Sequence, residues 1–160
     1  MKYLNSPGRM EYLTGKKKEG CVFCKHSVRE EHLILYEGER CAVMMNKYPY
    51  NTGHILVIPY RHISQLEELT GEEWLEMFRF TDCAVRALKE VMGAEGFNVG
   101  MNVGKAAGAG VESHLHLHIV PRWTGDTNFA TVVGDVRVIP QNVTETRALL
   151  LPCLKKYLEV

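Results

Sequence analysis

Three histidines, His114, His116 and His118, alternate with Leu115 and Leu117 in one short run of the chain. In a β-strand, successive side chains point to opposite faces of the sheet. This spacing therefore predicts three imidazoles on one face and apolar side chains on the other. A row of imidazoles can bind a metal, transfer protons, attack a phosphorus atom or hold an anion. The chain has seven histidines in 160 residues, and so close a group of three favours one of these chemistries over a structural strand edge.

A second pattern is the Cys-x-x-Cys pair of Cys21 and Cys24, in a chain with five cysteines. Disulfides are rare in cytoplasmic proteins, so such a pair more often binds a metal or performs redox chemistry. A redox pair favours the start of a helix, whereas this pair follows Gly20 and leads into polar residues. A structural zinc needs four ligands, so the chain must supply two more. Two buried thiols packed as small hydrophobic groups are the alternative. Three further cysteines have apolar neighbours and are expected in the core: Cys41, Cys83 and Cys153.

A glycine-rich stretch with one lysine precedes the histidine run; it contains Gly104, Lys105, Gly108 and Gly110. Glycines allow backbone N–H groups to turn toward an anion, and the lysine adds a positive charge. Many such loops are ordinary turns. Beside three imidazoles, however, this loop becomes a candidate phosphate-binding element, because phosphoryl transfer needs donors around the non-bridging oxygens.

Composition indicates one domain and restricts the partners. Nineteen basic residues balance nineteen acidic ones, so the broad positive field that holds polymeric nucleic acid is absent. The hydrophobic content of 46% suits a globular protein with a core. The sequence shows neither an apolar stretch long enough for a bilayer nor a secretory leader. A cytoplasmic protein with no membrane contact is expected.

The coarse pattern predicts an α+β domain. Thr70 and Glu73 form a capping box that begins one helix, and Gly93 ends it. Large apolar residues recur along this helix and are expected to face the core: Trp74, Phe78, Val85, Leu88 and Met92. Predicted strands cover residues 33–36, 41–46, 54–59, 97–103 and 114–120.

A last helix is predicted over residues 143–158. Asn142 is its expected N-cap, with Glu145 at the third helical position. Pro152 is expected to kink or end this helix. In the preceding strand, Pro121 is expected to end the run that carries the histidines.

The histidine run followed by two apolar residues resembles the motif of the histidine triad (HIT) family of nucleotide hydrolases and transferases. Gly53 and His54 before the apolar run 55–59, and residues 102–104 before the glycine-rich loop, resemble further parts of the family pattern. The resemblance covers about residues 21–123. It implies a single HIT domain over residues 1–160, with an antiparallel sheet flanked by helices and a dimer that extends the sheet.

The resemblance also implies roles for individual residues. His116 would be the nucleophile that takes the α-phosphoryl group of a nucleotide, and His118 would contact the phosphate and assist the leaving group. His54 would support the nucleophile's surroundings, and Asn46 would reach the ribose. Asn102 would bind the phosphate or the leaving group, together with the loop residues Gly104, Lys105, Gly108 and Gly110.

Family branches that carry the cysteine pair complete a zinc site with two histidines. Here those positions are His62, in the sequence Pro-x-x-His after the apolar strand, and His114. The resemblance therefore implies a structural zinc held by Cys21, Cys24, His62 and His114. It argues against a catalytic metal bound by the three histidines, because His114 is already used.

Residues just before the triad, together with three other segments, indicate which branch of the family the chain resembles. Gly110 and Val111 stand where phosphoramidases have a Gln-Ser or Gln-Thr pair. The segments 9–12, 121–129 and 138–141 resemble bacterial diadenosine tetraphosphate phosphorylases. That branch implies cleavage with phosphate as acceptor, giving ADP and ATP. A diadenosine polyphosphate or nucleoside phosphoramidate hydrolase is one alternative, and a non-catalytic nucleotide sensor is another.

Overall fold

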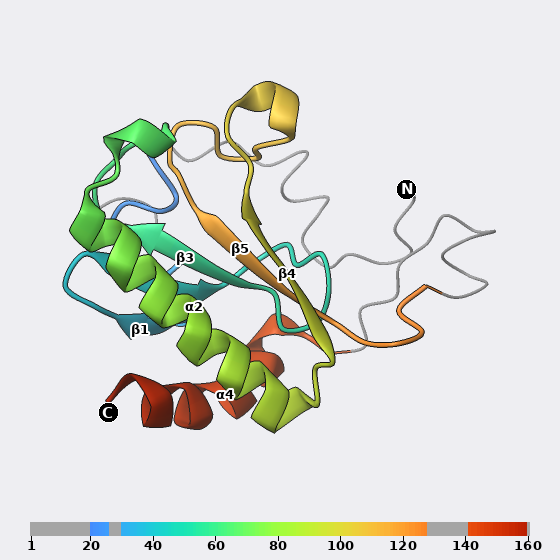
Figure 1. Ribbon diagram of the computed structural model, residues 1–160. Helices are drawn as coiled ribbons and strands as arrows, with labels where there is room; N and C mark the ends of the chain where they lie inside the picture. Colours follow the sequence, from blue (N-terminus) through green and yellow to red (C-terminus); the bar gives the residue numbers. More distant parts are fainter. Residues whose placement is uncertain (1–19, 26–29, 128–140, 160) are drawn as a thin grey trace.

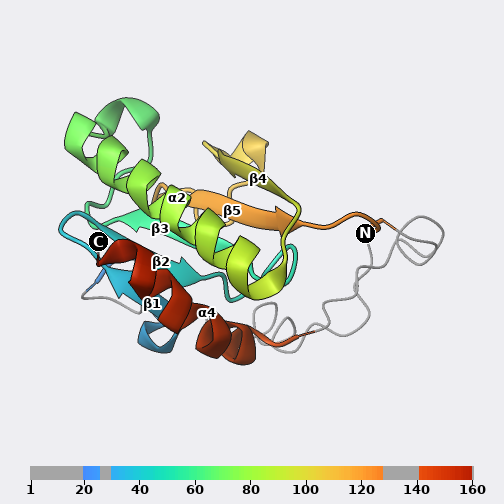
Figure 2. The same ribbon diagram turned by 60° about the horizontal axis from the view of Figure 1, so that its bottom comes forward.

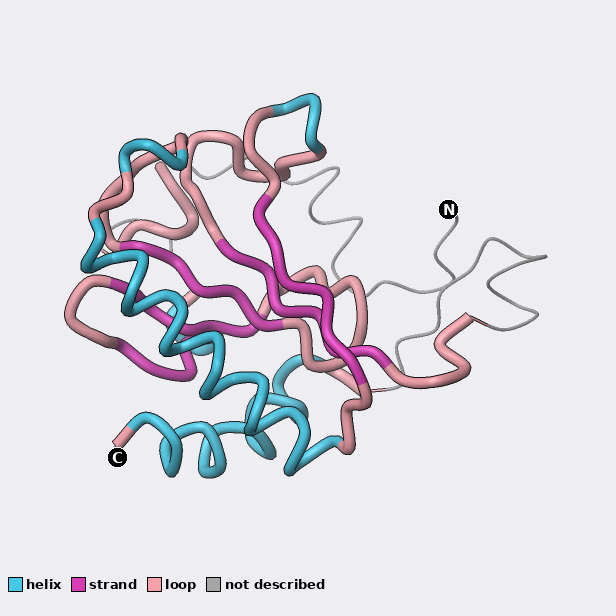
Figure 3. Tube along the Cα trace, in the orientation of Figure 1, coloured by secondary structure: helices cyan, strands magenta, loops and turns pink. Residues whose placement is uncertain are grey.

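Five strands form one antiparallel sheet in the computed structural model, which describes residues 20–25, 30–127 and 141–159. The strands are β1 (Ile34–Glu37), β2 (Cys41–Met45), β3 (Ile55–Pro59), β4 (Gly96–Met101) and β5 (Leu117–Arg122). They lie side by side in the order β1-β2-β3-β5-β4 (Figures 1 and 3). The helices are α2 (Gly71–Met92) and α4 (Val143–Leu158), with short 3-10 turns η1 (Glu31–Leu33), η2 (Leu66–Glu68) and η3 (Lys105–Ala107). The predicted α+β architecture is confirmed.

Helix α2 covers one face of the sheet. A cross-strand row runs from Tyr36 of β1 through Val43 to Leu117 of β5. Cross-strand partners point to the same face, and the ring of Tyr36 lies 5.5 Å from the ring of Phe80 in α2. Figures 1 and 2 show α4 beside α2. The next residue of β5, His118, therefore points to the face opposite α2.

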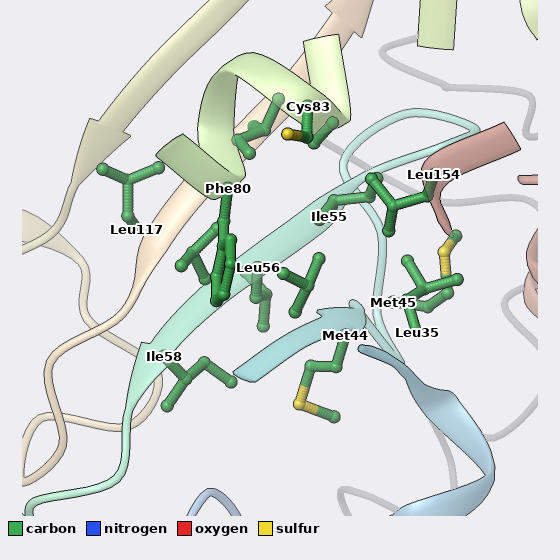
Figure 4. Packing of buried hydrophobic residues seen from close by; sticks show 14 of the residues in the cluster. Leu35, Met44, Met45, Ile55, Leu56, Ile58, Phe80, Cys83, Leu117 and Leu154 are labelled. Carbon is green, nitrogen blue, oxygen red and sulfur yellow. The ribbon is translucent and has the colours of Figure 1, made fainter. Parts of the chain in front are cut away.

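Apolar side chains from both helices fill the space against the sheet. Figure 4 shows Phe80 of α2 and Leu154 of α4 among the strand residues Ile55 and Met45. Each of these four is at most 2% exposed, and burial of such a side chain contributes about 1.5–3 kcal/mol. The cysteines outside the Cys-x-x-Cys pair lie in or against this core, as predicted: Cys41, Cys83 and Cys153.

The strand that carries His118 differs from its prediction at both ends. The prediction covered residues 114–120 and ended the strand at Pro121, but β5 begins at Leu117 and continues past Pro121. Pro121 pairs with Phe97 of β4, whereas the pairing with β3 stops at Ile119. Proline has no N–H to donate, so it fits where one side of a strand has no partner. The first two triad histidines therefore precede the regular strand.

Helix α2 begins and ends where predicted. The Thr70 hydroxyl accepts from the backbone N–H of Glu73 at 3.2 Å, and the Glu73 carboxylate accepts from the backbone N–H of Thr70 at 2.8 Å. This reciprocal pair is a capping box. Gly93 adopts a left-handed conformation with φ of 61° and ends the helix.

The buried face of α2 agrees only in part with the predicted one: Val85 and Met92 are partly buried and pack against the core. The prediction placed five large apolar residues in the core: Trp74, Phe78, Val85, Leu88 and Met92. Only Leu88 among them is buried, and Phe78 is 58% exposed. The helix buries Met77, Ala84 and Ala87 instead. Small alanines let a helix lie close to a sheet, and a pattern based on large side chains overlooks them.

Helix α4 has the predicted bounds, and the Asn142 side chain accepts from the backbone N–H of Glu145 at 2.8 Å. It does not end at Pro152. A proline inside a helix deprives the carbonyl four residues earlier of its partner. Here that residue is Ala148, which is exposed, as is Pro152, so water can reach the carbonyl. None of the described helices is both long and apolar enough to cross a bilayer.

Glu73 also links the start of α2 to the segment that follows β3. Its carboxylate accepts from Nε and Nη2 of Arg61 at 2.7 and 2.6 Å, and the side chain is 5% exposed. The Arg61 hydrogen bonds, with a smaller contribution from Thr70, lower the pKa of the Glu73 carboxyl to about 2. The chain just before His62 is therefore fixed to α2.

Replacing Glu73 with Gln should lower the free energy of unfolding by about 2 kcal/mol at neutral pH, because hydrogen bonds to charged groups contribute about 1.5–3 kcal/mol. The folded-state pKa lies below the unfolded value of 4.5. The stabilisation by the carboxylate is thus complete above about pH 4.5 and is lost as the pH falls toward 2.

Urea unfolding should therefore show that the difference in free energy of unfolding between wild type and Glu73→Gln is smaller at about pH 4 than at about pH 7. Glu72→Gln is the control, because that side chain lies on the same turn but is 74% exposed. Glu72→Gln should lower the free energy of unfolding by less than about 1 kcal/mol. A gap of equal size at both pH values would contradict this role for Glu73.

Candidate active site and metal centre

His118 and His54 meet on the face of the sheet opposite α2. His118 lies in β5 opposite Leu56 of β3, and His54 immediately precedes β3. Nε2 of His54 lies 2.9 Å from Nδ1 of His118, and the two side chains are 0% and 7% exposed. The pairing of β3 with β5 therefore brings together two histidines that are far apart in sequence.

The hydrogen bonds assign a tautomer to both rings. The backbone N–H of Tyr50 donates to Nδ1 of His54 at 3.0 Å, so the hydrogen of His54 is on Nε2. That Nε2 donates to Nδ1 of His118, which leaves the hydrogen of His118 on its own Nε2. The amide nitrogen Nδ2 of Asn102, just beyond β4, lies 3.5 Å from this Nε2; both atoms carry hydrogens in this tautomer, so the contact is a proximity and not a hydrogen bond. His118 thus presents an N–H beside Asn102.

The surroundings keep these rings neutral at physiological pH. Burial, with smaller contributions from His118 and His116, lowers the pKa of His54 to about 3. Burial, with a smaller contribution from His116, lowers the pKa of His118 to about 4. Burial also lowers the pKa of His116, and its hydrogen bond to the His114 backbone partly opposes this. Each ring therefore has one N–H and one nitrogen lone pair.

His116 is held in the tautomer that a nucleophile needs. Its Nδ1 lies 2.8 Å from the backbone carbonyl of His114. A carbonyl can only accept, so Nδ1 carries the hydrogen and Nε2 keeps its lone pair. The ring centroid of His116 lies 4.8 Å from that of His118. The site thus places a lone pair and an N–H donor on adjacent imidazoles.

The loop between β2 and β3 orients His54, and sequence reasoning missed two of its residues. The side-chain amide of Asn46 lies 3.3 Å from Nδ1 of His54, and its oxygen accepts from the backbone N–H of Tyr48 at 3.0 Å. Tyr50 stacks on His118 with ring centroids 5.5 Å apart. Asn51 is buried and donates to the Pro121 carbonyl at 3.1 Å. The sequence predicts only a turn for this segment. The contacts of Tyr50 and Asn51 are with β5, which is distant in sequence, so no local pattern indicates them.

The glycine-rich loop follows β4 and begins at Gly104. Gly104 and Gly108 have φ of 80° and 85°, a backbone conformation that favours glycine. The turn η3 lies between them, and Lys105 and Gly110 are exposed. The loop therefore begins two residues after Asn102, which contacts His118, and its far part faces solvent.

The predicted metal ligands lie together. Cys21, Cys24, His62 and His114 offer ligand atoms that all lie within 4.8 Å of one another. Nδ1 of His114 is 3.2 Å from Sγ of Cys21 and 3.6 Å from Sγ of Cys24, and Nδ1 of His62 is 3.3 Å from Sγ of Cys24. Tetrahedral zinc with bonds of about 2.3 Å to sulfur and 2.0–2.1 Å to nitrogen would place such atoms about 3.5 Å apart. The four residues therefore fit a tetrahedral metal ion.

The orientation of His114 supports the same reading. Its Nε2 lies 2.8 Å from the backbone carbonyl of Pro59, so Nε2 carries the hydrogen and Nδ1 is free to bind a metal. Metal-binding histidines commonly donate their other N–H to such an acceptor. Within the described parts of the chain, this is the one Cys/His/Asp/Glu cluster that could hold a metal. A metal bound by the three triad histidines is therefore not supported.

Comparisons with known proteins agree with these features. The HIT domain family model matches residues 28–125. The AP-4-A phosphorylase of Mycobacterium tuberculosis is 49% identical over 121 residues, which cover 76% of this chain and 62% of that protein. The chain thus spans about three-fifths of the length of that relative. An uncharacterised HIT-like protein of Methanocaldococcus jannaschii is 35% identical over 107 residues, covering 66% of this chain and 81% of that protein.

A solved structure shows the same arrangement of strands and helices. The crystal structure of a Zn-bound histidine triad family protein from Mycobacterium smegmatis has a TM-score of 0.65 at 32% identity. The match covers 79% of this chain and 86% of that chain. The family model spans more than half of the sequence, including His54 and all three triad histidines. The chain therefore belongs to the histidine triad (HIT) family.

Proposed function

We propose that this protein is a nucleotidyl transferase that cleaves diadenosine tetraphosphate and passes the nucleotide to phosphate, giving ADP and ATP. The observation that carries the proposal is the hydrogen bond from Nδ1 of His116 to the His114 carbonyl, which commits the hydrogen to Nδ1 and leaves Nε2 as the nitrogen that can attack. The name of the 49% identical relative, AP-4-A phosphorylase, supports the substrate and the acceptor.

The proposed reaction has two displacements at one phosphorus atom. Nε2 of His116 attacks the α-phosphorus, and the bond from that phosphorus to the bridging oxygen breaks, so ATP leaves. An oxygen of inorganic phosphate then attacks the adenylyl group, the P–N bond breaks, and ADP forms. Each displacement is easier than direct exchange, because imidazole is both a good nucleophile and a good leaving group.

His118 assists the leaving group by hydrogen bonding. Its Nε2–H is the donor that the tautomer assignment predicts beside Asn102. Full protonation of the departing ATP is unnecessary, because the second pKa of a terminal phosphate is about 6 and ATP leaves as an anion at neutral pH. The bond from His54 keeps this donor in place, so His54 acts as a positioning residue.

We assign the remaining polar groups to substrate binding. Asn102 binds the phosphates near His118, and Asn46 reaches the ribose. Backbone N–H groups and one positive charge contact the non-bridging oxygens from the loop residues Gly104, Lys105, Gly108 and Gly110. The positive φ of Gly104 and Gly108 supports this assignment, because it lets successive N–H groups turn to one side.

Phosphate should accelerate the cleavage of diadenosine tetraphosphate and direct the products to ADP and ATP, as chromatography of the nucleotides would show. Lys105→Gln should raise the phosphate concentration needed for half-maximal rate, whereas Lys155→Gln, on α4, should not. Formation of AMP and ATP at a rate independent of phosphate would favour a hydrolase. Tight nucleotide binding without any product would favour a sensor.

We further propose that the Cys–His cluster holds one structural zinc ion per chain. All four ligand positions are occupied by protein side chains, and a closed site of this kind stabilises a fold rather than activating water. The reduced cysteines suit the cytoplasmic location that the sequence predicts.

Freshly purified protein should contain one zinc per chain by elemental analysis. Cys24→Ser should lower the thermal midpoint of unfolding, because loss of a structural metal removes folding free energy. Cys153→Ser, which lies outside the cluster, should keep its zinc. Wild-type protein purified without chelator and free of zinc would refute the proposal.

We also propose a homodimer that extends the sheet through β4. This strand is at the edge of the sheet, and residues 98–100 within it are exposed (Figure 1). Unpaired edge strands can pair with a second copy.

Leu75 and Phe78 of α2 are 73% and 58% exposed. Lys89, three turns beyond Phe78 on the same helix face, lies over the ring of Phe97 in β4. The exposed apolar residues thus lie on the side of α2 that faces the open edge.

Phe78→Glu should convert the dimer to a monomer in sedimentation analysis, because it buries a charge in the proposed contact. Leu149→Glu is the matched control: Leu149 is 53% exposed, and its helix α4 contacts β1, the edge strand opposite β4. A monomeric wild type, or a dimer that Phe78→Glu leaves intact, would contradict this arrangement.

A further inference from the structure

One of the two residues between the cysteines, Phe23, contacts the candidate nucleophile. Phe23 is 9% exposed, and its ring lies 4.8 Å from the ring of His116 at an angle of 51°. The same ring meets His114 edge-on, with centroids 5.8 Å apart and an angle of 83°. Phe23 therefore touches one predicted metal ligand and the predicted nucleophile at once.

The position of Phe23 is tied to the cysteine ligands. Its backbone N–H donates to Sγ of Cys21 at 3.4 Å, so the sulfur that would bind the metal also fixes the backbone that carries the ring. Cys24 follows directly and contacts both His62 and His114. The geometry of the ligand set thus determines where the aromatic ring lies.

A second connection runs through His114. Its ring directs Nδ1 toward the cysteines, while its backbone carbonyl accepts from Nδ1 of His116 at 2.8 Å. Its other ring nitrogen is bound to the Pro59 carbonyl, and the residue is 0% exposed. Movement of His114 away from the cysteines would therefore move the acceptor that fixes the tautomer of His116.

We infer that the Cys–His cluster positions the nucleophile, with Phe23 as the positioning residue that holds the His116 ring against the His114 carbonyl. Two changes would abolish attack by Nε2: a rotation of the ring, or a shift of its hydrogen from Nδ1 to Nε2. Contact with Phe23 restricts the rotation, and the carbonyl opposes the shift. Phe23 itself takes no part in bond formation.

The test compares Phe23→Leu with Phe80→Leu in the protein as purified, with its metal content measured. Both substitutions replace a buried phenylalanine, but Phe80 belongs to α2 and packs against Tyr36, on the face of the sheet opposite the histidines. Long-range ¹H–¹⁵N correlation spectra of histidine-labelled protein report which ring nitrogen of His116 carries the hydrogen. A spectrum of His116→Gln assigns the resonances.

In wild type and Phe80→Leu, the His116 resonances should show one tautomer with the hydrogen on Nδ1. In Phe23→Leu they should shift toward a mixture of tautomers, and kcat should fall about 10- to 100-fold with KM nearly unchanged, because small displacements of a reacting group cost about that much. The kinetic part rests on the proposed transfer reaction, whereas the spectra do not. A wild type without turnover would refute the proposed function and leave the spectra as the test.

Three results would overturn the inference. The first is a Phe23→Leu protein with wild-type His116 resonances and wild-type kcat, with or without its metal. The second is a change confined to KM, which would mean that Phe23 contacts the nucleotide instead. The third is an equal change in Phe80→Leu, which would show a general effect of core truncation.

Discussion

The hydrogen bond from Nδ1 of His116 to the carbonyl of His114 decides which imidazole nitrogen can attack a phosphorus atom. A free imidazole exchanges its hydrogen between both nitrogens. Here Nδ1 donates its hydrogen to the backbone carbonyl, so Nε2 keeps its lone pair. No separate base is needed to remove a proton from Nε2 before it attacks. Burial lowers the pKa of the ring and so favours this neutral form. The proposed chemistry depends on that arrangement.

The surrounding fold serves to hold this pair of residues. Pairing of β3 with β5 places His54 against His118, and the Tyr50 backbone sets the direction of the bond between them. Helix α2 covers the other face, which leaves the histidine face to the loops. Both cysteines of the Cys-x-x-Cys pair contact Nδ1 of the His114 ring through their sulfur atoms. Each triad histidine therefore has different contacts, although their spacing in the sequence is the same: His114 with the cysteines, His116 with a carbonyl and His118 with His54.

Features that depend on a few neighbouring residues could be predicted from the sequence. The capping box of Thr70 and Glu73, and the helix from Val143 to Leu158, follow from local signals, and the structure confirms both. Alternation along the triad predicted correctly that Leu117 and His118 face opposite sides. The predicted metal ligands came from the family resemblance, and the structure brings all four together.

Features that depend on the sheet could not be predicted in this way. The buried face of α2 is chosen by the strands beneath it, so Ala84 and Ala87 are buried while Phe78 is exposed. Pro121 can lie within β5 because it is beyond the first residue of β3, Ile55, which pairs with Ile119, so no β3 residue needs its missing N–H. The contact of Phe23 with His116 joins segments that are distant in sequence, and no local pattern indicates it.

The most direct measurement of the central claim is peptide mapping by mass spectrometry after rapid quenching of the protein with diadenosine tetraphosphate in the absence of phosphate. The account predicts an adenylyl group on His116, lost on addition of phosphate with formation of ADP, and no such group in His116→Ala. Product formation by wild-type protein without an adduct, or with the adduct on His118 or another residue, would contradict it.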